Sequence, residues 1–371
     1  MPLVAHNELP TFRVLRERGE VVLTVERARE QDIRELHIGF LNMMPDAALT
    51  ATERQFIRLI GSSNPIAQFY VYPFTLPELN RSEKALEHVR KHYFDFAELA
   101  ELGLDALIIT GANVSNPALE QEPFWKPLIN IVEWAHDNVA SVFCSCLATH
   151  ALVKHYHGID RRRLPRKQWG VYSHRITHPE HPFLRDVNTR FDAPHSRYND
   201  VSREQLEAAG LMVLAESAEV GVHLAVSPDQ FRIMYFQGHP EYSTISLLKE
   251  CKREVERYLR GEREAVPRIP ENYFSAAGEE IAAAHIEAAV RARAQGQTSL
   301  SFPEDELLTY ADNTWGDTGR AIVNNWLGLV YQVTNLDRRS QFMPGIDRDD
   351  PLGIRAGGQR VGIPAVPPIH V

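Results

Sequence analysis

Short apolar runs alternate with amphipathic stretches along the first 150 residues of the chain. Four of the runs suit buried strands, and they begin near Leu36, Gln68, Ala106 and Ala140. Segments from about residue 50 and over 123–138 instead carry apolar residues at helical spacing. This alternation of strands and helices predicts a parallel sheet with helices on both faces.

The pattern changes in the second half of the chain. From about 170 to 242 the apolar runs are shorter and alternate with polar residues, which predicts mixed or antiparallel strands. Helical patterns follow over 243–259, 278–294 and 318–333. The predicted fold class is therefore α/β: a flavodoxin-like parallel sheet flanked by helices, an additional mixed or antiparallel strand region, and a C-terminal helical extension.

Composition and charge argue against several classes of protein. The formal net charge of -9 argues against a nucleic-acid-binding protein, which normally presents a basic surface. Three cysteines in 371 residues do not form a disulfide framework, so we expect a cytoplasmic protein. The N-terminus lacks the basic start and the apolar stretch that together indicate a signal peptide. No run approaches the ~20 apolar residues that span a bilayer.

Cys146 is the most informative residue. It ends the apolar run 140–146, and the helical pattern beginning at Leu147 follows at once. A cysteine at such a junction lies near a helix N-terminus, where the amide dipoles favour a thiolate. A lone buried cysteine is more often a small apolar residue, and Cys144, two residues earlier, is interpreted in that way.

A second motif supports the functional interpretation of Cys146. The apolar run 231–237 ends in Gly238-His239-Pro240-Glu241, where Glu241 can orient the His239 ring. Ligand sites of parallel sheets lie at the carboxyl ends of the strands, and both motifs follow strand ends. Cysteine, histidine and glutamate are then the nucleophile, base and orienting group of one site. The histidines near Cys146 lack metal-site spacing, so no metal is expected.

At this point the chain resembles the homoserine O-acyltransferase family, of the homoserine O-succinyltransferase type. Such enzymes have a fold like that of class I glutamine amidotransferases. The resemblance extends to about residue 336 and depends on several motifs together: Glu8-Leu-Pro, Leu41-Asn-Met-Met-Pro, Thr110-Gly-Ala, Cys146-Leu-Ala-Thr-His-Ala, Gly170-Val-Tyr, Ala193-Pro-His-Ser-Arg-Tyr, Gly238-His-Pro-Glu-Tyr, Asn272-Tyr-Phe, Asn325-Trp-Leu and Tyr331-Gln-Val-Thr.

The resemblance implies a role for each matched residue. It implies that Cys146 is the acylated nucleophile, His239 the general base and Glu241 its orienting group. It also implies that three residues contact the substrate: Lys167, Ser196 and Arg253, the last through the carboxylate of the amino acid. The position that selects the acyl group in the family is Ser115 here, and an uncharged serine favours succinyl. Independently, the amide of Leu147 at the start of the helix suits an oxyanion hole.

The expected reaction moves a succinyl group from succinyl-CoA to the hydroxyl of L-homoserine, a step of methionine biosynthesis. Acyl-CoA is then a co-substrate, no cofactor is needed, and the family suggests a homodimer. Asp46 and Ala47 stand where the family usually has a lysine. The alternatives left open are acetyl-CoA as donor or serine as acceptor, a glutaminase-type hydrolase, and a non-catalytic sensor or scaffold.

This interpretation of the sequence divides the chain into five predicted parts. These are an N-terminal arm (1–35), a catalytic α/β acyltransferase domain (36–262), a loop and helical insertion (263–305), a C-terminal helix packed on the core (306–340) and an irregular tail (341–371).

Overall fold

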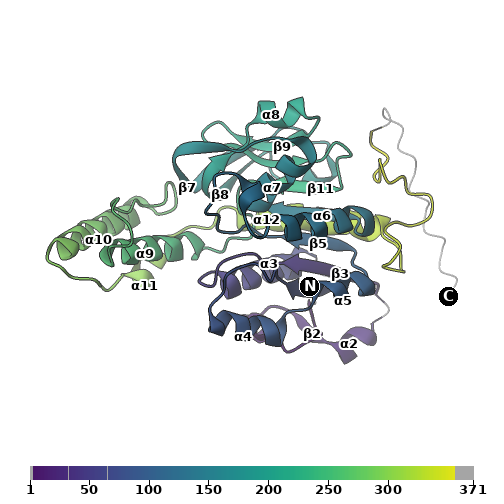
Figure 1. Cartoon of the computed structure of the whole chain (residues 1–371), viewed down its shortest axis with the longest axis horizontal. Helices are drawn as coiled ribbons and strands as arrows, with labels where there is room; N and C mark the ends of the chain where they lie inside the picture. Colours follow the sequence, from purple (N-terminus) through teal and green to yellow (C-terminus); the bar gives the residue numbers. More distant parts are fainter. Residues whose placement is uncertain (1–2, 32, 65, 356–371) are drawn as a thin grey trace.

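One mixed sheet organises the molecule (Figure 1). The computed structural model describes residues 3–31, 33–64 and 66–355. Eleven strands among these follow the order β2-β1-β4-β3-β5-β6-β11-β10-β9-β7-β8. Pairing is parallel from β2 to β11 and antiparallel from β11 to β8. The strands are β1 (Leu3–Ala5), β2 (Val22–Thr24), β3 (Glu35–Leu41), β4 (Gln68–Phe74), β5 (Ala106–Ile109), β6 (Ser141–Ser145), β7 (Arg162–Ile176), β8 (Arg190–Asp200), β9 (Met212–Ser217), β10 (Gly221–Val226) and β11 (Ile233–Phe236).

The predicted fold class is confirmed. Strands β3, β4, β5 and β6 coincide with the four apolar runs, and they are buried because helices cover both sheet faces. One face packs against α1 (Pro10–Glu17), α3 (Leu49–Ser63) and α12 (Gly316–Val333). The other face packs against α5 (Phe96–Leu102), α6 (Trp125–Asn138), α7 (Leu147–His157) and α8 (Arg203–Ala208). Two further helices are α2 (Val25–Arg29) and α4 (Glu83–His92).

Two parts of the sheet differ from what the apolar pattern predicts. Residues 1–35, expected as an arm, contribute β1 and β2 to the edge of the parallel sheet, and β1 is too short to show a pattern. Strand β8 carries Pro194, His195 and Arg197, residues that are rare in strand cores, and it was not predicted. Its partner β7 begins within the basic run 161–167, and short basic runs of this kind usually form part of the surface. The division into five parts stays a prediction.

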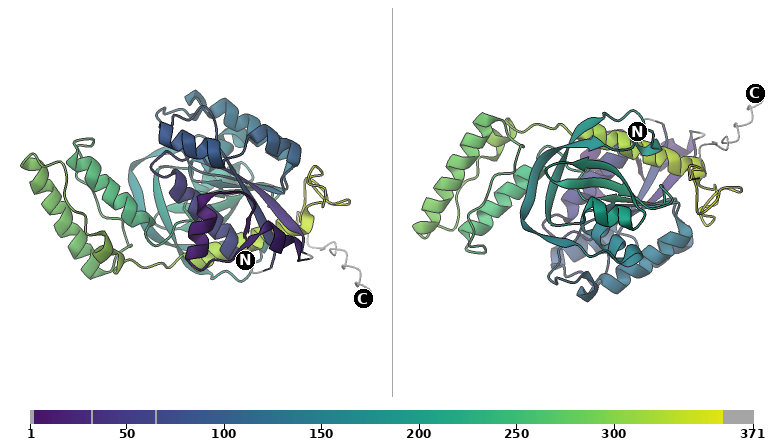
Figure 2. Two further views of the ribbon diagram at one scale, coloured as in Figure 1. Left: turned by 90° about the horizontal axis from the view of Figure 1, so that it is seen from below. Right: turned by 90° about the horizontal axis from the view of Figure 1, so that it is seen from above.

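Three helices form a lobe that projects from the sheet (Figures 1 and 2). They are α9 (Ser246–Leu259), α10 (Ala276–Ala294) and α11 (Glu304–Leu308). The helix expected over 278–294 is therefore present, and it packs Ala289 and Ala292 against Val255 and Leu259 of α9. The N-terminal half of α9 reaches the sheet edge and carries residues of the site described below.

The C-terminal part has no helix or strand between 341 and 355, as expected for an irregular tail. Phe342, Ile346 and Leu352 nevertheless pack against the main core. The rest of the predicted tail, 356–371, lies outside the described residues. None of the described helices is both long and apolar enough to cross a membrane.

Candidate active site

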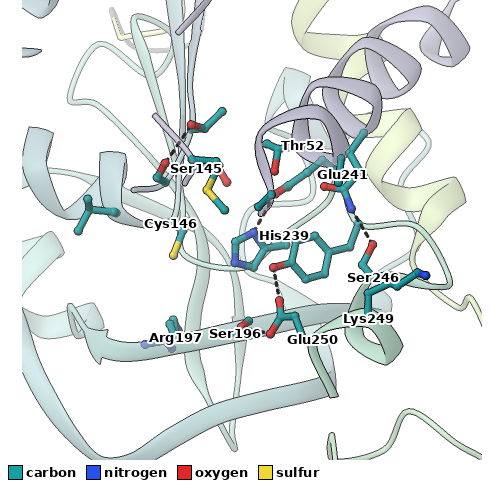
Figure 3. Close-up of a pocket in the computed structure, with 18 of the residues that line it drawn as sticks. Thr52, Ser145, Cys146, Ser196, Arg197, His239, Glu241, Ser246, Lys249 and Glu250 are labelled. Atoms are coloured by element: carbon teal, nitrogen blue, oxygen red, sulfur yellow. Dashed lines mark hydrogen bonds and ion pairs between the residues drawn. The ribbon is translucent and has the colours of Figure 1, made fainter. Parts of the chain in front are cut away.

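Cys146 occupies the sharp turn between β6 and α7. Its backbone has φ 54° and ψ −107°, a sparsely populated region for a residue with a side chain. Strain of this kind persists where the surroundings enforce it, and here the Cys146 amide donates to the Phe236 carbonyl over 2.8 Å. The predicted strand-to-helix junction is confirmed, and the sulfur points into the space beyond the strand ends (Figure 3).

The next amide, that of Leu147, lies beside an opening kept by Gly111. A Cβ at Gly111 would lie 3.6 Å from the Cys146 Cβ and 3.8 Å from the Leu147 nitrogen. Leu147 is the first residue of α7, so its N–H has no acceptor within the helix. The glycine therefore leaves room beside a free amide of the type that stabilises a developing oxyanion.

His239 is brought to Cys146 by the pairing of two strands. Strands β6 and β11 are parallel neighbours, with Ser145 opposite Phe236, so the residues after both strands share one sheet edge. The His239 amide donates to the Pro194 carbonyl over 2.8 Å, which fixes the turn. Its Nδ1 lies 2.8 Å from Oε1 of Glu241. Its Nε2 is buried without a hydrogen-bond partner in the described structure, and the ring lies between Glu241 and the sulfur (Figure 3).

The charges around His239 favour its protonated form. Burial alone lowers the pKa of the ring, but the Glu241 carboxylate and the nearby Cys146 outweigh burial and raise the pKa to about 10. The ring is therefore a cation at neutral pH. A cysteine beside such a ring suits a nucleophilic site.

A cavity of about 1070 Å³ surrounds this pair. Its walls come from the β3–α3 loop, α3, β7, β8 and the start of α9. Ten Lys and Arg residues and only three Glu line it, although the whole chain has a net charge of -9. The cavity contains all but one of the residues predicted for the site: Cys146, Leu147, Lys167, Ser196, His239, Glu241 and Arg253.

Ser115 is the predicted site residue that the cavity does not include. It is exposed on the loop after β5. Glu122 holds this loop, because its Oε1 accepts hydrogen bonds from the amides of Ser115, over 2.7 Å, and Asn116, over 2.6 Å. The position of Ser115 gives no support for contact with an acyl group, and its role in selecting that group stays a prediction.

Glu250 is a site residue that the sequence did not reveal. Its carboxylate accepts hydrogen bonds from Ser196 Oγ over 2.7 Å and Tyr242 OH over 2.6 Å, and pairs with Lys167 Nζ at 3.0 Å. Tyr242 in turn stacks on the His239 ring with centroids 4.3 Å apart. Only the amphipathic pattern of α9 pointed to this position, one turn before Arg253. Glu250 links the predicted substrate contacts to His239, the predicted general base.

The contacts of Glu250 predict a pH-dependent contribution to stability. Burial raises its pKa, but the Lys167 charge and the two hydroxyl donors outweigh burial and lower the pKa from 4.5 to about 2. The ionised carboxylate therefore stabilises the fold above about pH 4.5, and this contribution is lost as the pH falls toward 2. Glu250→Gln should lower the free energy of unfolding by on the order of 3 kcal/mol at pH 7.

Urea denaturation of wild type and Glu250→Gln at pH 7 and pH 3.5 measures this contribution. The difference between the two proteins should shrink at the lower pH. Glu256→Gln, on the same helix but without an ion pair in the described structure, is the control and should change little. A difference for Glu250→Gln that is the same at both pH values would contradict the assignment.

The β3–α3 loop lacks the lysine expected from the family, and the charged side chain that it does carry, Asp46, does not face the cavity. Asp46 lies 3.6 Å from Arg81 and accepts from the Ser82 amide over 2.7 Å, away from the cavity that Ala47 and Ala48 line. Two arginines lie near the thiol, Arg161 and Arg197, and Arg197 is already paired with Asp200 at 2.7 Å. Burial lowers the pKa of Arg161 and the proximity of Cys146 raises it, and the described residues give it no ion pair or side-chain hydrogen bond.

Three buried histidines lie beneath the site, with ring nitrogens within 4.8 Å of one another: His174, His195 and His223. Arg197 Nε donates to His195 Nδ1 over 3.2 Å, so His195 Nε2 donates to His174 Nε2 over 3.1 Å. His174 Nδ1 then donates to the Tyr172 carbonyl over 2.8 Å. Burial lowers the pKa of all three rings. This order of donors suits neutral rings, and a metal would require Arg197 to give up its bond to His195.

Comparison with known proteins agrees with this geometry. The family model for homoserine O-succinyltransferase matches residues 2–336. The chain belongs to the homoserine O-succinyltransferase family. Two curated members, from Methylococcus capsulatus and Allochromatium vinosum, are each 58% identical to it over 95% and 96% of this chain and 100% of their own length. The family resemblance seen in the sequence is confirmed.

The crystal structure of a glutamine amidotransferase from Thermotoga maritima is similar over 80% of this chain and 98% of its own, with 11% identity and a TM-score of 0.43.

Proposed function

We propose that this chain transfers a succinyl group from succinyl-CoA to the hydroxyl of L-homoserine through a thioester on Cys146. The observation that carries the proposal is the arrangement of Cys146, His239 and Glu241 in a cavity whose lining is strongly cationic. Both substrates bear carboxylates and the donor also bears phosphates, so a cationic cavity suits them. Membership of the family supports the same reaction.

In the first step the Cys146 thiolate attacks the thioester carbonyl of the donor. The carbonyl oxygen becomes an oxyanion beside the Leu147 amide. The bond to the coenzyme A sulfur then breaks, and His239 gives its proton to the leaving thiolate. The products of this step are free coenzyme A, a neutral His239 and a succinyl thioester on Cys146.

Acylation itself prepares His239 for the second step. The thioester sulfur carries no charge, so one of the two influences that raise the pKa of the ring disappears. The neutral ring removes the proton of the homoserine hydroxyl as the oxygen attacks the thioester. Cys146 leaves as a thiolate, and the protonated His239 completes the original ion pair.

The acceptor is held from the α9 side of the cavity. Arg253 is half-buried there and is placed to pair with the homoserine carboxylate. Lys167 and Ser196 lie on the opposite wall and are positioned by Glu250. This arrangement supports the substrate contacts that the family resemblance implies.

Arg161 suits the free carboxylate of the succinyl group, because its charge lies near the thiol and is not neutralised by a described carboxylate. Arg161→Gln should therefore lower kcat/KM for succinyl-CoA by about 10- to 100-fold. With butyryl-CoA, whose acyl chain ends in a methyl group, the same variant should change little. The neighbouring Arg162→Gln, which faces solvent and Asp200, is the matched control. Equal losses with both donors would show that Arg161 acts on the thiolate instead.

A panel of donors and acceptors tests the reaction as a whole. Succinyl-CoA, acetyl-CoA and glutamine are offered as donors, with homoserine, serine or water as acceptors. The proposal predicts O-succinylhomoserine as the preferred product. Preferred acetyl transfer, preferred serine, glutamine hydrolysis or no activity would each support one of the alternative readings.

The remaining expectations belong to the same proposal. No cofactor or metal takes part, since the two steps need only the acyl-CoA co-substrate and the described side chains. We propose a cytoplasmic homodimer that binds neither nucleic acid nor membranes, consistent with the acidic net charge of -9.

A further inference from the structure

Three arginines line the end of the cavity formed by α1 and α3, and the reaction steps above do not use them. Arg18 directly follows α1, and Arg54 and Arg58 lie one turn apart on the same face of α3. None of the three has an ion pair or a side-chain hydrogen bond in the part of the chain that the structure describes. Arginines left without partners in a cavity wall indicate an anionic ligand.

The charges of this group are close enough to affect one another. Burial lowers the pKa of Arg58, Glu20 raises it, and Arg320 on α12 and Arg18 lower it further. Glu20 does not come within ion-pair distance of any of them in the described structure. Arg54 and Arg58 are partly buried and Arg18 is exposed, and an anion bound among them would relieve the repulsion between their charges.

Cations on the α9 wall of the cavity already have carboxylate partners. Lys249 on the α9 wall pairs with Glu304, and Arg257 lies 3.5 Å from Glu262. The arginines at the α1–α3 end therefore differ from those on the α9 wall, where the acceptor is placed.

Helix α3 gives the distance from this group to the loop beside the Cys146 turn. Ala48, at the start of the helix, follows the loop that holds Met44, whose Sδ would lie 3.7 Å from a Cβ at Gly111. Arg58 lies ten residues further, which is about 15 Å along the helix axis. The extended pantetheine arm that separates a thioester from the phosphates of coenzyme A has a comparable length.

We propose that Arg18, Arg54 and Arg58 bind the phosphate groups of the acyl-CoA donor. This inference depends on the proposed function. Guanidinium groups form bidentate hydrogen bonds with phosphate, and three of them match a ligand with a diphosphate and a 3′-phosphate. The pantetheine arm then runs along α3, with its thioester at Cys146.

Truncated donors test the proposal. The variants Arg58→Gln and Arg54→Gln/Arg58→Gln are assayed with succinyl-CoA and with succinyl-pantetheine, which has the same thioester but lacks the nucleotide. We expect kcat/KM for succinyl-CoA to fall about 10-fold and 100-fold, mainly through KM, with no change for succinyl-pantetheine. Arg13→Gln, an exposed arginine of α1 that contacts only Glu17, should behave as wild type with both donors.

Two results would overturn the assignment. Equal losses with both donors would mean that the arginines affect the fold or the reacting groups and not the nucleotide. Unchanged kinetics with succinyl-CoA would mean that the arginines do not contact the donor. Calorimetry with adenosine 3′,5′-bisphosphate separates this inference from the proposed function. If wild type transfers no succinyl group yet binds this probe and Arg58→Gln does not, the reaction is wrong and the phosphate site stands; binding by neither rejects the site.

Discussion

The Cys146→Ala variant is expected to lose succinyl transfer by about 10⁴-fold or more. The sulfur is the only group in the proposed mechanism that bonds to the acyl group, and alanine offers no replacement. The fold should persist, because Cys146 is only partly buried and its turn is fixed by the backbone bond to Phe236. Steady-state production of O-succinylhomoserine measures the loss, and circular dichroism checks the fold.

Cys144→Ala is the matched control for this experiment. Cys144 lies two residues earlier on β6 and is buried in the core, away from the cavity. Its loss should cost some stability through a small void and leave kcat/KM within a few-fold of wild type. A Cys146→Ala enzyme with a rate near that of wild type would mean that homoserine attacks the donor directly, without a covalent step.

The His239→Asn variant is expected to lose about 10³- to 10⁴-fold in kcat/KM. Asparagine cannot carry the proton that the mechanism assigns to His239. This proton stabilises the thiolate and then leaves with coenzyme A, and a proton from homoserine replaces it in the second step. Both release of coenzyme A in a single turnover and transfer to homoserine should slow. Stopped-flow detection of the released thiol follows the first step, and product analysis follows the second.

The Glu241→Gln variant tests His239 indirectly, by removing the carboxylate that is hydrogen-bonded to its ring. Removing the carboxylate removes the larger of the two influences that raise the pKa of His239 to about 10, so that pKa should fall. Proton titration of the ring by nuclear magnetic resonance detects this directly. His157→Asn, on α7 and outside the cavity, is the control and should keep both activity and titration. An unchanged His239 pKa in Glu241→Gln would remove Glu241 from its orienting role.

The parallel core was predictable because its strands are buried on both faces. Runs such as Ala106–Ile109 are continuously apolar, and helical spacing between the runs is clear. Strand β8 was not predictable, because it combines Pro194, His195 and Arg197, and part of their hydrogen bonding comes from His174 and the Val220 carbonyl, which are distant in the sequence. Strand β1 has three residues, too few to show a period.

The proximity of Cys146 and His239 was predictable because both follow strand ends, where ligands of parallel sheets bind. Glu250 and the arginines of α3 were not, since a charged residue on an amphipathic helix normally faces solvent. Only the fold shows that these charges line a cavity and which of them have partners. Ser115 shows the opposite case, because a position inferred from the family lies just outside the cavity, after the lining residue Val114, where Glu122 accepts a hydrogen bond from its amide.

The most direct test of the covalent mechanism is the intact mass of the protein after mixing with succinyl-CoA in the absence of homoserine. We expect one added succinyl group, located by peptide mapping on Cys146, removed when homoserine is added and absent from Cys146→Ala. An enzyme that makes O-succinylhomoserine at full rate while never acquiring this mass would contradict the mechanism.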